Sequence, residues 1–298
     1  MRITDYEDTR GETAGVKDKE KTKEQLIDEL VEMRQRLAEL KVAEAKRKEA
    51  EEALIRITGK LEQSNRELQD FTYISSHHMQ EPLRKIQAFG YRLRMKFDDT
   101  LDDKGRDYLE RMQNAAARMQ TLINDLLAYS WITTRACPFV PTDLTQSARE
   151  AELDLEVRIE RTGGQVEIDE LPTIDADSEQ MRQLLRNLMS NALKFHRPNV
   201  RPVVKVFADQ KSNACCQINV KDNGIGFDEK YLARIFTPFQ RLHNRVEFEG
   251  TGMGLAICRK IAERHDGIIT AKSTPGQGTT VTVTLPVKQP KGKSHHEN

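Results

Sequence analysis

The run KDNGIGF (Lys221–Phe227) decides how the C-terminal half of this chain folds. The strand-like stretch Gln217–Val220 leads into Asp222, so the run predicts a strand that ends at a carboxylate. Gly224 and Gly226 then make a tight loop, because glycine lets the backbone approach a flat ring closely. A carboxylate beside such a ring can accept a hydrogen bond from an exocyclic amine. The run therefore predicts the base end of a nucleotide site.

A second motif, RNLMSNALKF (Arg186–Phe195), comes before this run. Asn187 and Asn191 are four residues apart, so they share one face of a predicted helix. Their uncharged amide oxygens suit a Mg²⁺ ion that already carries triphosphate oxygens. The motif therefore predicts the metal and phosphate side of the same site.

A third motif, EGTGMGLA (Glu249–Ala256), follows the run. Gly250, Gly252 and Gly254 precede the apolar stretch LAICRKIA, so bare backbone N–H groups stand at the start of a helix. Phosphate binds favourably at such a position. Each motif alone is a weak signal, but their order within about 70 residues indicates a nucleotide site.

These motifs make the chain similar to the sensor histidine kinases of two-component signalling, in the branch of the phytochrome-like kinases, over roughly residues 60–286. The matching boxes are the phosphoacceptor box SSHHMQEPLRKI (Ser75–Ile86), the N box (Asn187 and Asn191), the first glycine box (Asp222–Gly226), the F box FTPF (Phe236–Phe239) and the second glycine box (Gly250–Gly254). The resemblance implies an ATP-dependent histidine kinase.

The resemblance also points to the phosphoacceptor. In the family box the nucleophilic histidine lies six residues after an aromatic residue and five before a proline, and Phe71 and Pro82 both give His77. Position 78 lies seven residues after Phe71, so we expect it toward the bundle interior and His77 on the flank. The family normally has Asp or Glu where His78 stands. His78 is therefore either a base that orients the acceptor imidazole or an ordinary bundle residue.

The remaining site residues follow from the resemblance. It implies that Asn191 is the principal Mg²⁺ ligand with Asn187 nearby, that Lys194 reaches the phosphates, and that Asp222 holds the adenine amine. The residues expected to complete the ATP site are Gly224, Gly226, Phe236, Phe239, Arg241, Gly250, Gly252, Gly254 and Thr279.

Some charged residues have two interpretations. Phe236 and Phe239 hinge a lid that runs to about residue 250, and its cations either touch the γ-phosphate or are simply solvated; these are Arg241, His243 and Arg245. Lys85 and Arg84, just after the acceptor, either stabilise phosphohistidine or form a solvated face.

Two other functions compete with the kinase. Type II topoisomerases, mismatch-repair ATPases and a heat-shock chaperone share the nucleotide fold but place a Glu at the first N-box position to activate water. Asn187 stands there and cannot accept a proton, which disfavours hydrolysis. The second alternative is a dimeric ATP-binding scaffold or pseudokinase, because His78 replaces the usual acidic residue. Glu81, four residues after His77, stands where kinases with phosphatase activity carry Thr or Asn.

The expected fold class is α plus α/β, with an N-terminal coiled coil and a dimeric four-helix bundle followed by a two-layer α/β sandwich that binds ATP. The expected domains are a flexible N-terminus (1–18), a coiled-coil signalling helix (19–70), a dimerisation and phosphotransfer hairpin (71–134), a catalytic domain (142–286) and a disordered tail (287–298). The seam residues are Leu26, Leu30, Met33, Leu37 and Leu40, then, after a phase change, Leu54, Ile57, Leu61, Leu68 and Phe71.

Local patterns predict the order of the elements. The expected helices cover 71–96 with a kink at Pro82, 104–132, 144–161, an N-box helix capped by Asp177, and a last helix to about 265. The expected strands are a pair at 165–168 and 173–176, two at 203–208 and 216–220, and a hairpin of 268–273 with 279–285. Residues 133–141, which contain two prolines, are expected to form the interdomain linker.

Composition limits the partners. The 47 basic and 47 acidic residues cancel, which argues against nucleic acid, and no stretch is apolar enough for a membrane span. The four cysteines have no metal-ligand spacing and are expected to be reduced thiols. We therefore expect a cytoplasmic homodimer with ATP and Mg²⁺ as cofactors. Its expected partners are a receiver domain of a response regulator and an upstream sensor protein, since no sensory domain precedes the coiled coil.

Overall fold

The computed structural model describes residues 22–134, 137–209, 214–242, 248 and 250–288. The expected flexible N-terminus, 1–18, lies outside these ranges, as does the expected disordered tail (287–298) apart from its first two residues. The start of that tail is ordered, contrary to the expectation, because the Val287 N–H donates to the Ala214 carbonyl at 2.9 Å and the Val287 carbonyl accepts from the Asp175 N–H at 2.9 Å. The chain divides into two compact units, Met1–Leu68 and Gln69–Asn298. Among the helices of the described residues, none has an apolar stretch that could cross a bilayer.

Helix α2 (Lys23–Phe97) is 75 residues long and begins in the first unit. Thr22 and Gln25 cap its start reciprocally: the Thr22 N–H donates to Gln25 Oε1 at 3.0 Å, and the Gln25 N–H donates to Thr22 Oγ1 at 3.4 Å. Leu30, Met33 and Leu37 of the seam are each more than half exposed in the single chain. Such a seam is stabilised when a second helix covers it, so the coiled coil stays a prediction that this exposure supports.

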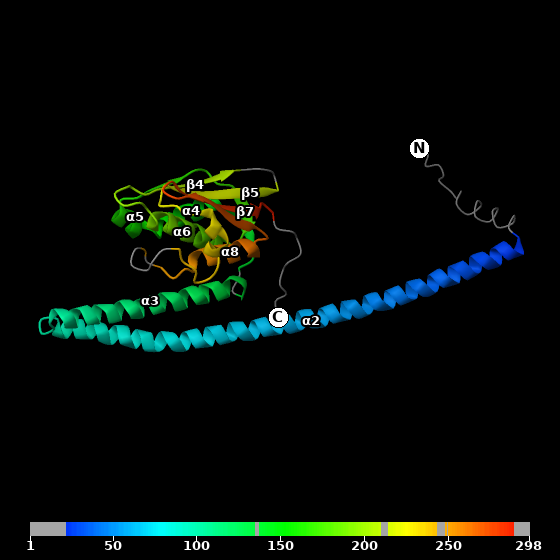
Figure 1. The fold of residues 1–298 in the computed structure, drawn as a ribbon, viewed down its shortest axis with the longest axis horizontal. Coiled ribbons are helices and arrows are strands. Elements are labelled where there is room, and N and C mark those ends of the chain that lie inside the picture. The colour runs from blue at the N-terminus through cyan, green and yellow to red at the C-terminus, as the bar shows by residue number, and fades with distance from the viewer. Residues whose placement is uncertain (1–21, 135–136, 210–213, 243–247, 249, 289–298) are drawn as a thin grey trace, which may run out of the picture. The chain divides into compact units, whose positions relative to one another are not determined.

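The second unit begins with a helical hairpin (Figure 1). Helix α2 passes through Pro82 without ending, turns at residue 97, and α3 (Asp103–Thr134) returns beside it. The hairpin has a small apolar core of its own, which consists of Leu83, Ala116, Ile123 and Leu127.

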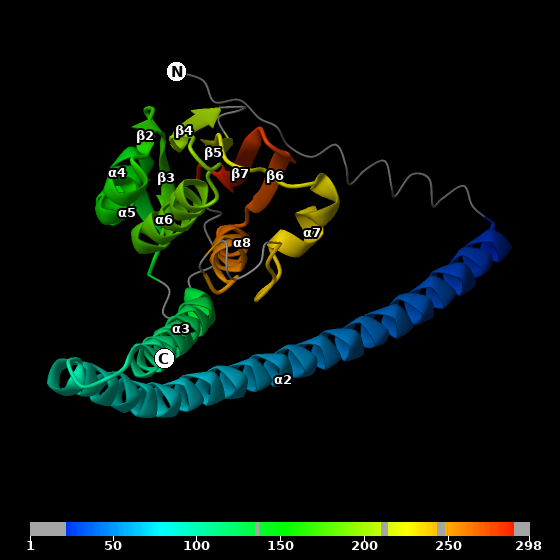
Figure 2. The same cartoon turned by 60° about the vertical axis from the view of Figure 1, so that its left-hand side comes forward.

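The rest of the second unit contains a five-stranded sheet in the order β2-β4-β5-β7-β6 (Figure 2). Its strands are β2 (Gln165–Ile168), β4 (Val203–Asp209), β5 (Cys215–Asp222), β6 (Ile268–Thr274) and β7 (Gly278–Pro286). β2 pairs with β4 in parallel, and every other pair is antiparallel. The predicted hairpin of β6 and β7 is confirmed, with Thr274 opposite Gly278 at its turn.

Helices cover one face of this sheet, which gives the two-layer sandwich expected from the sequence (Figures 1 and 2). They are α4 (Leu144–Leu153), α5 (Glu156–Thr162), α6 (Ser178–Lys194) and α8 (Gly254–Arg264). A 3₁₀ turn (Glu229–Tyr231) and the short α7 (Leu232–Ile235) follow β5. The predicted cap of the N-box helix is confirmed, because the Asp177 side chain accepts a hydrogen bond from the Gln180 N–H.

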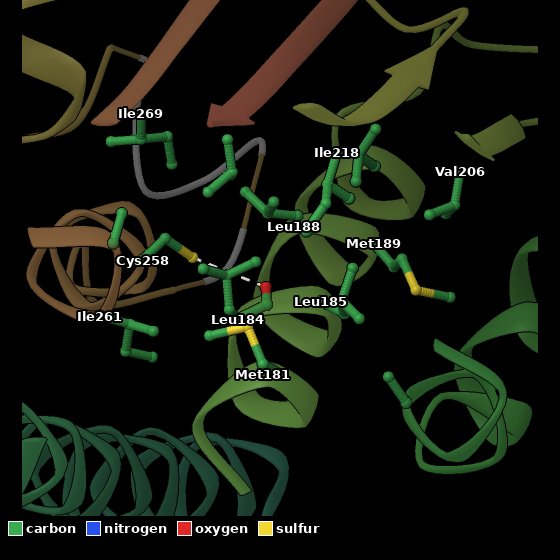
Figure 3. Packing of buried hydrophobic residues seen from close by; sticks show 14 of the residues in the cluster. Met181, Leu184, Leu185, Leu188, Met189, Val206, Ile218, Cys258, Ile261 and Ile269 are labelled. Carbon is green, nitrogen blue, oxygen red and sulfur yellow. Dashed lines mark hydrogen bonds between the residues drawn. The ribbon is translucent and has the colours of Figure 1, made fainter. Parts of the chain in front are cut away.

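The core of the sandwich forms between α6, α8 and the sheet (Figure 3). The side chains of α6 that enter it are almost fully buried; among them are Met181, Leu184, Leu185, Leu188 and Met189. Burial raises the pKa of the Cys258 thiol to about 12 and that of Cys216 to about 11. Both thiols therefore stay protonated at neutral pH, which makes them poor nucleophiles.

Three local expectations were wrong. The segments 165–168 and 173–176 form strands but do not pair together: β2 pairs with β4, and β3 (Thr173–Ala176) pairs with β1 (Val140–Asp143). The reason is that the connection between them crosses the start of α4, where buried Leu171 enters the core and its N–H donates to Thr145 Oγ1 at 2.9 Å.

The predicted helix 144–161 is two helices, because the chain turns at Asp154 and Leu155. Asp154 Oδ1 there accepts an ion-pair hydrogen bond from Arg182 Nη2 at 2.8 Å. The predicted linker is also shorter than expected. Helix α3 continues to Thr134, and Pro141 lies inside β1, which as a strand with one partner tolerates a proline.

Candidate nucleotide site and phosphoacceptor

Asp222 ends β5 and marks the base end of the site. Its Oδ1 atom accepts two backbone hydrogen bonds, from Gly224 N at 2.8 Å and from Thr279 N at 3.0 Å. Burial raises the pKa of this carboxyl group, while the two hydrogen bonds lower it. Within the described residues no hydrogen bond reaches Oδ2, so this oxygen can accept one from an exocyclic amine.

The glycine loop after Asp222 is pressed against its neighbours. A Cβ atom at Gly224 would stand 2.3 Å from the Phe195 carbonyl oxygen, and one at Gly226 would stand 2.1 Å from that of Thr274. Gly226 also has a φ of +60°, a conformation that glycine adopts without strain. The loop is therefore fixed in place by the backbone on both sides.

Arg197 joins this loop to the β6–β7 turn, and the sequence reasoning missed it. Its Nε donates to the Asn223 carbonyl at 3.0 Å, and its Nη1 donates to the Gly276 carbonyl at 3.1 Å. Only the fold brings these three residues together, since they come from separate segments. The contact holds the two loops at the base end at a fixed spacing.

The N box lies opposite the start of α8. Asn187 Nδ2 donates to the Gly254 carbonyl at 3.4 Å, and a Cβ atom at Gly254 would stand 3.8 Å from Asn191 Nδ2. Lys194 Nζ would stand 2.9 Å from a Cβ at Gly250 and lies 4.0 Å from the centre of the Phe195 ring. The structure therefore gathers both asparagines, Lys194 and the second glycine box around one point.

This group fits a metal-bound nucleotide. The asparagine amide oxygens are neutral oxygen donors, which suit Mg²⁺ that already carries phosphate oxygens. Gly250 and Gly252 have φ values of +133° and +80°, so their backbone can adopt the turn that exposes N–H groups at a helix start.

The expected lid is only partly described. Phe236 is buried with 8% of its surface exposed, whereas Phe239 is 54% exposed and has a φ of +63°. Arg241 donates from both guanidinium ends to lid carbonyls, those of Phe248 and Gly250. It therefore braces the lid here, and its expected contact with phosphate stays a prediction. His243 and Arg245 lie outside the described residues.

The phosphoacceptor box lies on the α2 half of the hairpin. His77 and His78 are both exposed, and their rings meet edge to face with centroids 6.1 Å apart. The buried positions of this stretch are Ser76, Leu83 and Gly90, at intervals of seven. Position 78 is not among the positions that the single chain buries, so the expectation that it faces the interior of the dimeric bundle stays a prediction. The choice of His77 now rests on its spacing from Phe71 and Pro82.

The cations after the acceptor are placed as follows. Lys85 Nζ forms an ion pair with Glu81 Oε1 at 2.7 Å, and this pair lowers the pKa of the exposed Glu81 carboxyl group. Arg84 is exposed. Such surface pairs contribute little stability, so Lys85 can leave Glu81 for a stronger anion at low cost.

The sequence also missed a contact between the hairpin and the site. The hydroxyl of Thr251, in the second glycine box, donates to Asp125 Oδ2 on α3. Asp125 carried no motif of its own, and only the packing of α3 against α8 identifies it.

Comparison with known proteins agrees with this geometry. Residues 67–135 match the family described as the His Kinase A (phospho-acceptor) domain. Residues 176–289 match the family of histidine kinase-, DNA gyrase B- and HSP90-like ATPases. The fold and site thus define an ATP-binding kinase domain joined to a phosphoacceptor hairpin.

Several relatives have both parts. The phytochrome-like protein Cph1 of Synechocystis sp. is 39% identical over 236 residues, which cover 79% of this chain and 31% of that protein. Cyanobacterial phytochrome A of Nostoc sp. is 42% identical over 234 residues, 78% of this chain and 30% of that protein. The chain belongs to the sensor histidine kinases of two-component signalling. It spans about a third of the length of these two relatives.

A solved structure has the same fold. The crystal structure of full-length ShkA in complex with AMPPNP superposes with a TM-score of 0.57, over 73% of this chain and 45% of that one. At 24% sequence identity this likeness concerns the fold alone.

Proposed function

We propose that this chain autophosphorylates His77 from ATP and passes the phosphoryl group to an Asp in the receiver domain of a separate response regulator. The observation that carries the proposal is the environment of the Asp222 carboxylate. A buried carboxylate with one oxygen fixed by Gly224 and Thr279 and the other available for an amine suits adenine recognition. The exposure of His77 on the hairpin supports it as the acceptor.

Each group of residues in the site would have its own role in binding ATP. Asp222 would bind the base, Lys194 and the amides of the second glycine box would neutralise phosphate charge, and Asn187 with Asn191 would hold Mg²⁺. The bound metal ion would supply further charge neutralisation on the phosphates. In the transfer step a ring nitrogen of His77 forms a bond to the γ-phosphorus while the bond from that phosphorus to the ADP oxygen breaks.

The proton on the other ring nitrogen of His77 needs an acceptor. His78 is close enough for its ring to meet that of His77, and a neutral imidazole can accept a proton. We therefore propose His78 as the orienting residue. Because the exposed ion pair between Lys85 and Glu81 is weak, Lys85 would be available to bind the phosphoryl group on His77.

Asn187 argues against water as the phosphoryl acceptor. Its side chain lies at the start of α8 and donates to the Gly254 carbonyl, and an amide cannot take a proton from water. The site lacks a general base at the first N-box position. Transfer to a histidine is therefore a better use of the site than hydrolysis.

One observation favours a second candidate, an ATP-binding scaffold without autophosphorylation. His78 occupies the position of the usual acidic residue, and the rings of His77 and His78 meet edge to face with no hydrogen bond between them in the described structure. Such a protein would bind ATP through Asp222 and dimerise without labelling His77.

Labelling with ATP that carries a radioactive γ-phosphate tests the proposal. The wild-type protein should become labelled, His77→Ala should lose the label entirely, and His78→Ala should keep a reduced label. The label should survive base and disappear in acid, as phosphohistidine does. Label that persists in His77→Ala but vanishes in His78→Ala would move the acceptor to position 78. A wild-type protein that binds ATP but never becomes labelled would favour the scaffold function over the kinase function.

We also propose the partners and the location that follow from this reaction. The hairpin would dimerise with a second copy, an upstream sensor protein would act through the N-terminal helix, and a receiver domain would take the phosphoryl group. A reaction that consumes ATP would take place in the cytoplasm, where ATP is available.

A further inference from the structure

The contact between Asp125 and Thr251 joins two functional parts that lie 126 residues apart in the sequence. Asp125 is on α3 of the hairpin, and Thr251 is in the glycine turn expected to bind phosphate. Thr251 Oγ1 donates to Asp125 Oδ2 and accepts from Met253 N at 3.3 Å. The hydroxyl therefore connects a carboxylate on the hairpin to a backbone amide at the start of α8.

Asp125 lies on one stripe of α3 that faces the catalytic domain. Tyr129, four residues later, lies under Lys260 of α8, whose Nζ is 4.2 Å from the ring centre. Ile132, three residues further, accepts a hydrogen bond at its carbonyl from Gln180 Nε2 of α6 at 2.9 Å. The two hydrogen bonds and the cation–π contact lie along the same helix face, so they form one docking surface.

This surface is imperfectly packed. A half-open pocket of about 300 Å³ lies beside it, with Ala128, Ile132, Gln180 and Arg186 among its lining residues. Within the described residues, the Oε1 atom of Gln180 is buried and has no hydrogen-bond partner. An unpaired buried acceptor costs stability. This cost offsets part of what the buried Ile132 side chain contributes to docking, and the Asp125–Thr251 bond adds to the stabilising side.

The carboxylate of Asp125 is also badly placed for a charged nucleotide. Burial raises its pKa, and the hydrogen bond from Thr251 and the charge of Arg186 on α6 lower it. A carboxylate bonded to the glycine turn brings a negative charge to the point where γ-phosphate charge would arrive. Like charges in a partly buried site repel each other more strongly than they do in water.

The bond also lies close to the acceptor along the hairpin. Asn124, the neighbour of Asp125, accepts a hydrogen bond at Oδ1 from Gln80 Nε2 at 3.0 Å. Gln80 is three residues after His77, so the glycine turn is bonded to the hairpin about one helical turn from the acceptor.

We propose that Asp125 and Thr251 form a latch that distinguishes ATP from ADP: it holds the catalytic domain on α3 when the site is empty or carries a diphosphate, and the γ-phosphate opens it. The proposal rests on the proposed ATP binding. Because coupling is reciprocal, a bond that the γ-phosphate weakens must in turn weaken ATP binding. The latch thereby lowers the affinity for ATP relative to ADP, and its opening frees the glycine turn to move toward His77.

The test compares four full-length proteins at one Mg²⁺ concentration: wild type, Asp125→Asn, Asp125→Ala and Asp107→Asn. Asparagine keeps an oxygen that accepts from Thr251 but removes the charge, whereas alanine removes both. Asp107 is on the same helix and pairs with Arg111 at 2.8 Å, away from the site, so it controls for the loss of one carboxylate. Affinities for ADP and for a non-hydrolysable ATP analogue are measured by fluorescence competition, and docking is measured by deuterium uptake of residues 125–132.

Asp125→Asn should bind the ATP analogue about five- to tenfold more tightly with less than a twofold change for ADP, the lower end of ordinary coupling between sites. The analogue should raise deuterium uptake of residues 125–132 in the wild type and much less in Asp125→Asn, while Asp125→Ala should show high uptake in every state. An ATP-to-ADP affinity ratio that is the same in the wild type and in Asp125→Asn overturns the latch. A wild-type protein that binds neither nucleotide overturns the proposed function itself.

Discussion

At the scale of single residues, Asp222 gives the sharpest prediction, because both backbone N–H groups that bond to it donate to the same oxygen, Oδ1. In Asp222→Asn the amide oxygen should take the place of Oδ1, since Gly224 N and Thr279 N both need an acceptor there. The side-chain NH₂ group then occupies the place of Oδ2. It is a hydrogen-bond donor and so cannot accept from the exocyclic amine of the base. We expect the affinity for ATP to fall about 10- to 100-fold, as when a buried polar group loses its partner.

The same substitution should leave the fold almost unchanged, because it keeps both backbone hydrogen bonds. Titration calorimetry with ATP and a thermal melt of the same sample separate the two effects. Asp169→Asn serves as the control, since Asp169 is an exposed residue that pairs with Lys205 at 3.6 Å. An unchanged ATP affinity in Asp222→Asn would remove this carboxylate from base recognition.

At the scale of elements, a buried network ties α6, α8 and the start of the catalytic domain together. His265, at the end of α8, is fully buried; its Nε2 accepts from Asp177 N at 3.1 Å and its Nδ1 lies 2.8 Å from the Ile261 carbonyl. A neutral ring with its proton on Nδ1 satisfies both bonds, and a protonated ring cannot accept from Asp177 N. Arg264 adds a hydrogen bond to Asp177 Oδ2 at 3.0 Å.

This network predicts a pH dependence of stability. Burial is the main cause that lowers the pKa of His265, and Arg264 lowers it further, against the opposing effects of the Ile261 hydrogen bond and nearby Asp177 and Asp266. The unfolded chain, with a His pKa of about 6.5, then binds more protons than the folded chain. Stability should be complete above about pH 6.5 and should fall as the pH drops below that value.

Thermal melts between pH 7.5 and 5.5 measure this loss, where about 1 kcal/mol corresponds to about 2–4 °C for a domain of this size. His265→Gln should be less stable at pH 7.5, because it loses part of the network, and should show a smaller drop toward pH 5.5. His196→Gln is the control, since His196 is only partly buried. Equal slopes for the wild type and His265→Gln would contradict the assignment.

The element scale also shows what the sequence could and could not predict. Periodicity found α3, α6, α8 and the β6–β7 hairpin, since each buries one regular face against the core. It could not find the partners of β2 and β3, because a strand pattern contains no information on which strand lies beside it. Long-range polar contacts such as those of Arg197 and Asp125 follow from packing alone, so no sequence motif could predict them.

At the scale of the whole molecule, the hairpin leaves apolar side chains uncovered in a regular pattern. Met79, Ile86 and Leu93 lie at intervals of seven on α2 and are 43%, 42% and 46% exposed. Met112 and Met119 on α3 show the same interval, with 41% and 51% exposed. A seven-residue apolar repeat beside an already buried one is typical of a helix that packs against two neighbours. The second neighbour is therefore expected in another copy of the chain.

This pattern predicts a homodimer that one charge can break. Ile86→Glu places a carboxylate in the middle of the uncovered repeat, and burying an unpaired charge there should cost several kcal/mol, enough to separate the protomers at micromolar concentration. Ala88→Glu adds the same charge at an exposed position on another face of the same helix and should leave the dimer intact. Light scattering coupled to size exclusion gives the masses directly. A wild-type protein with the 34.2 kDa mass of one chain would refute the dimer, and dissociation by Ala88→Glu alone would place its interface on the wrong face of α2.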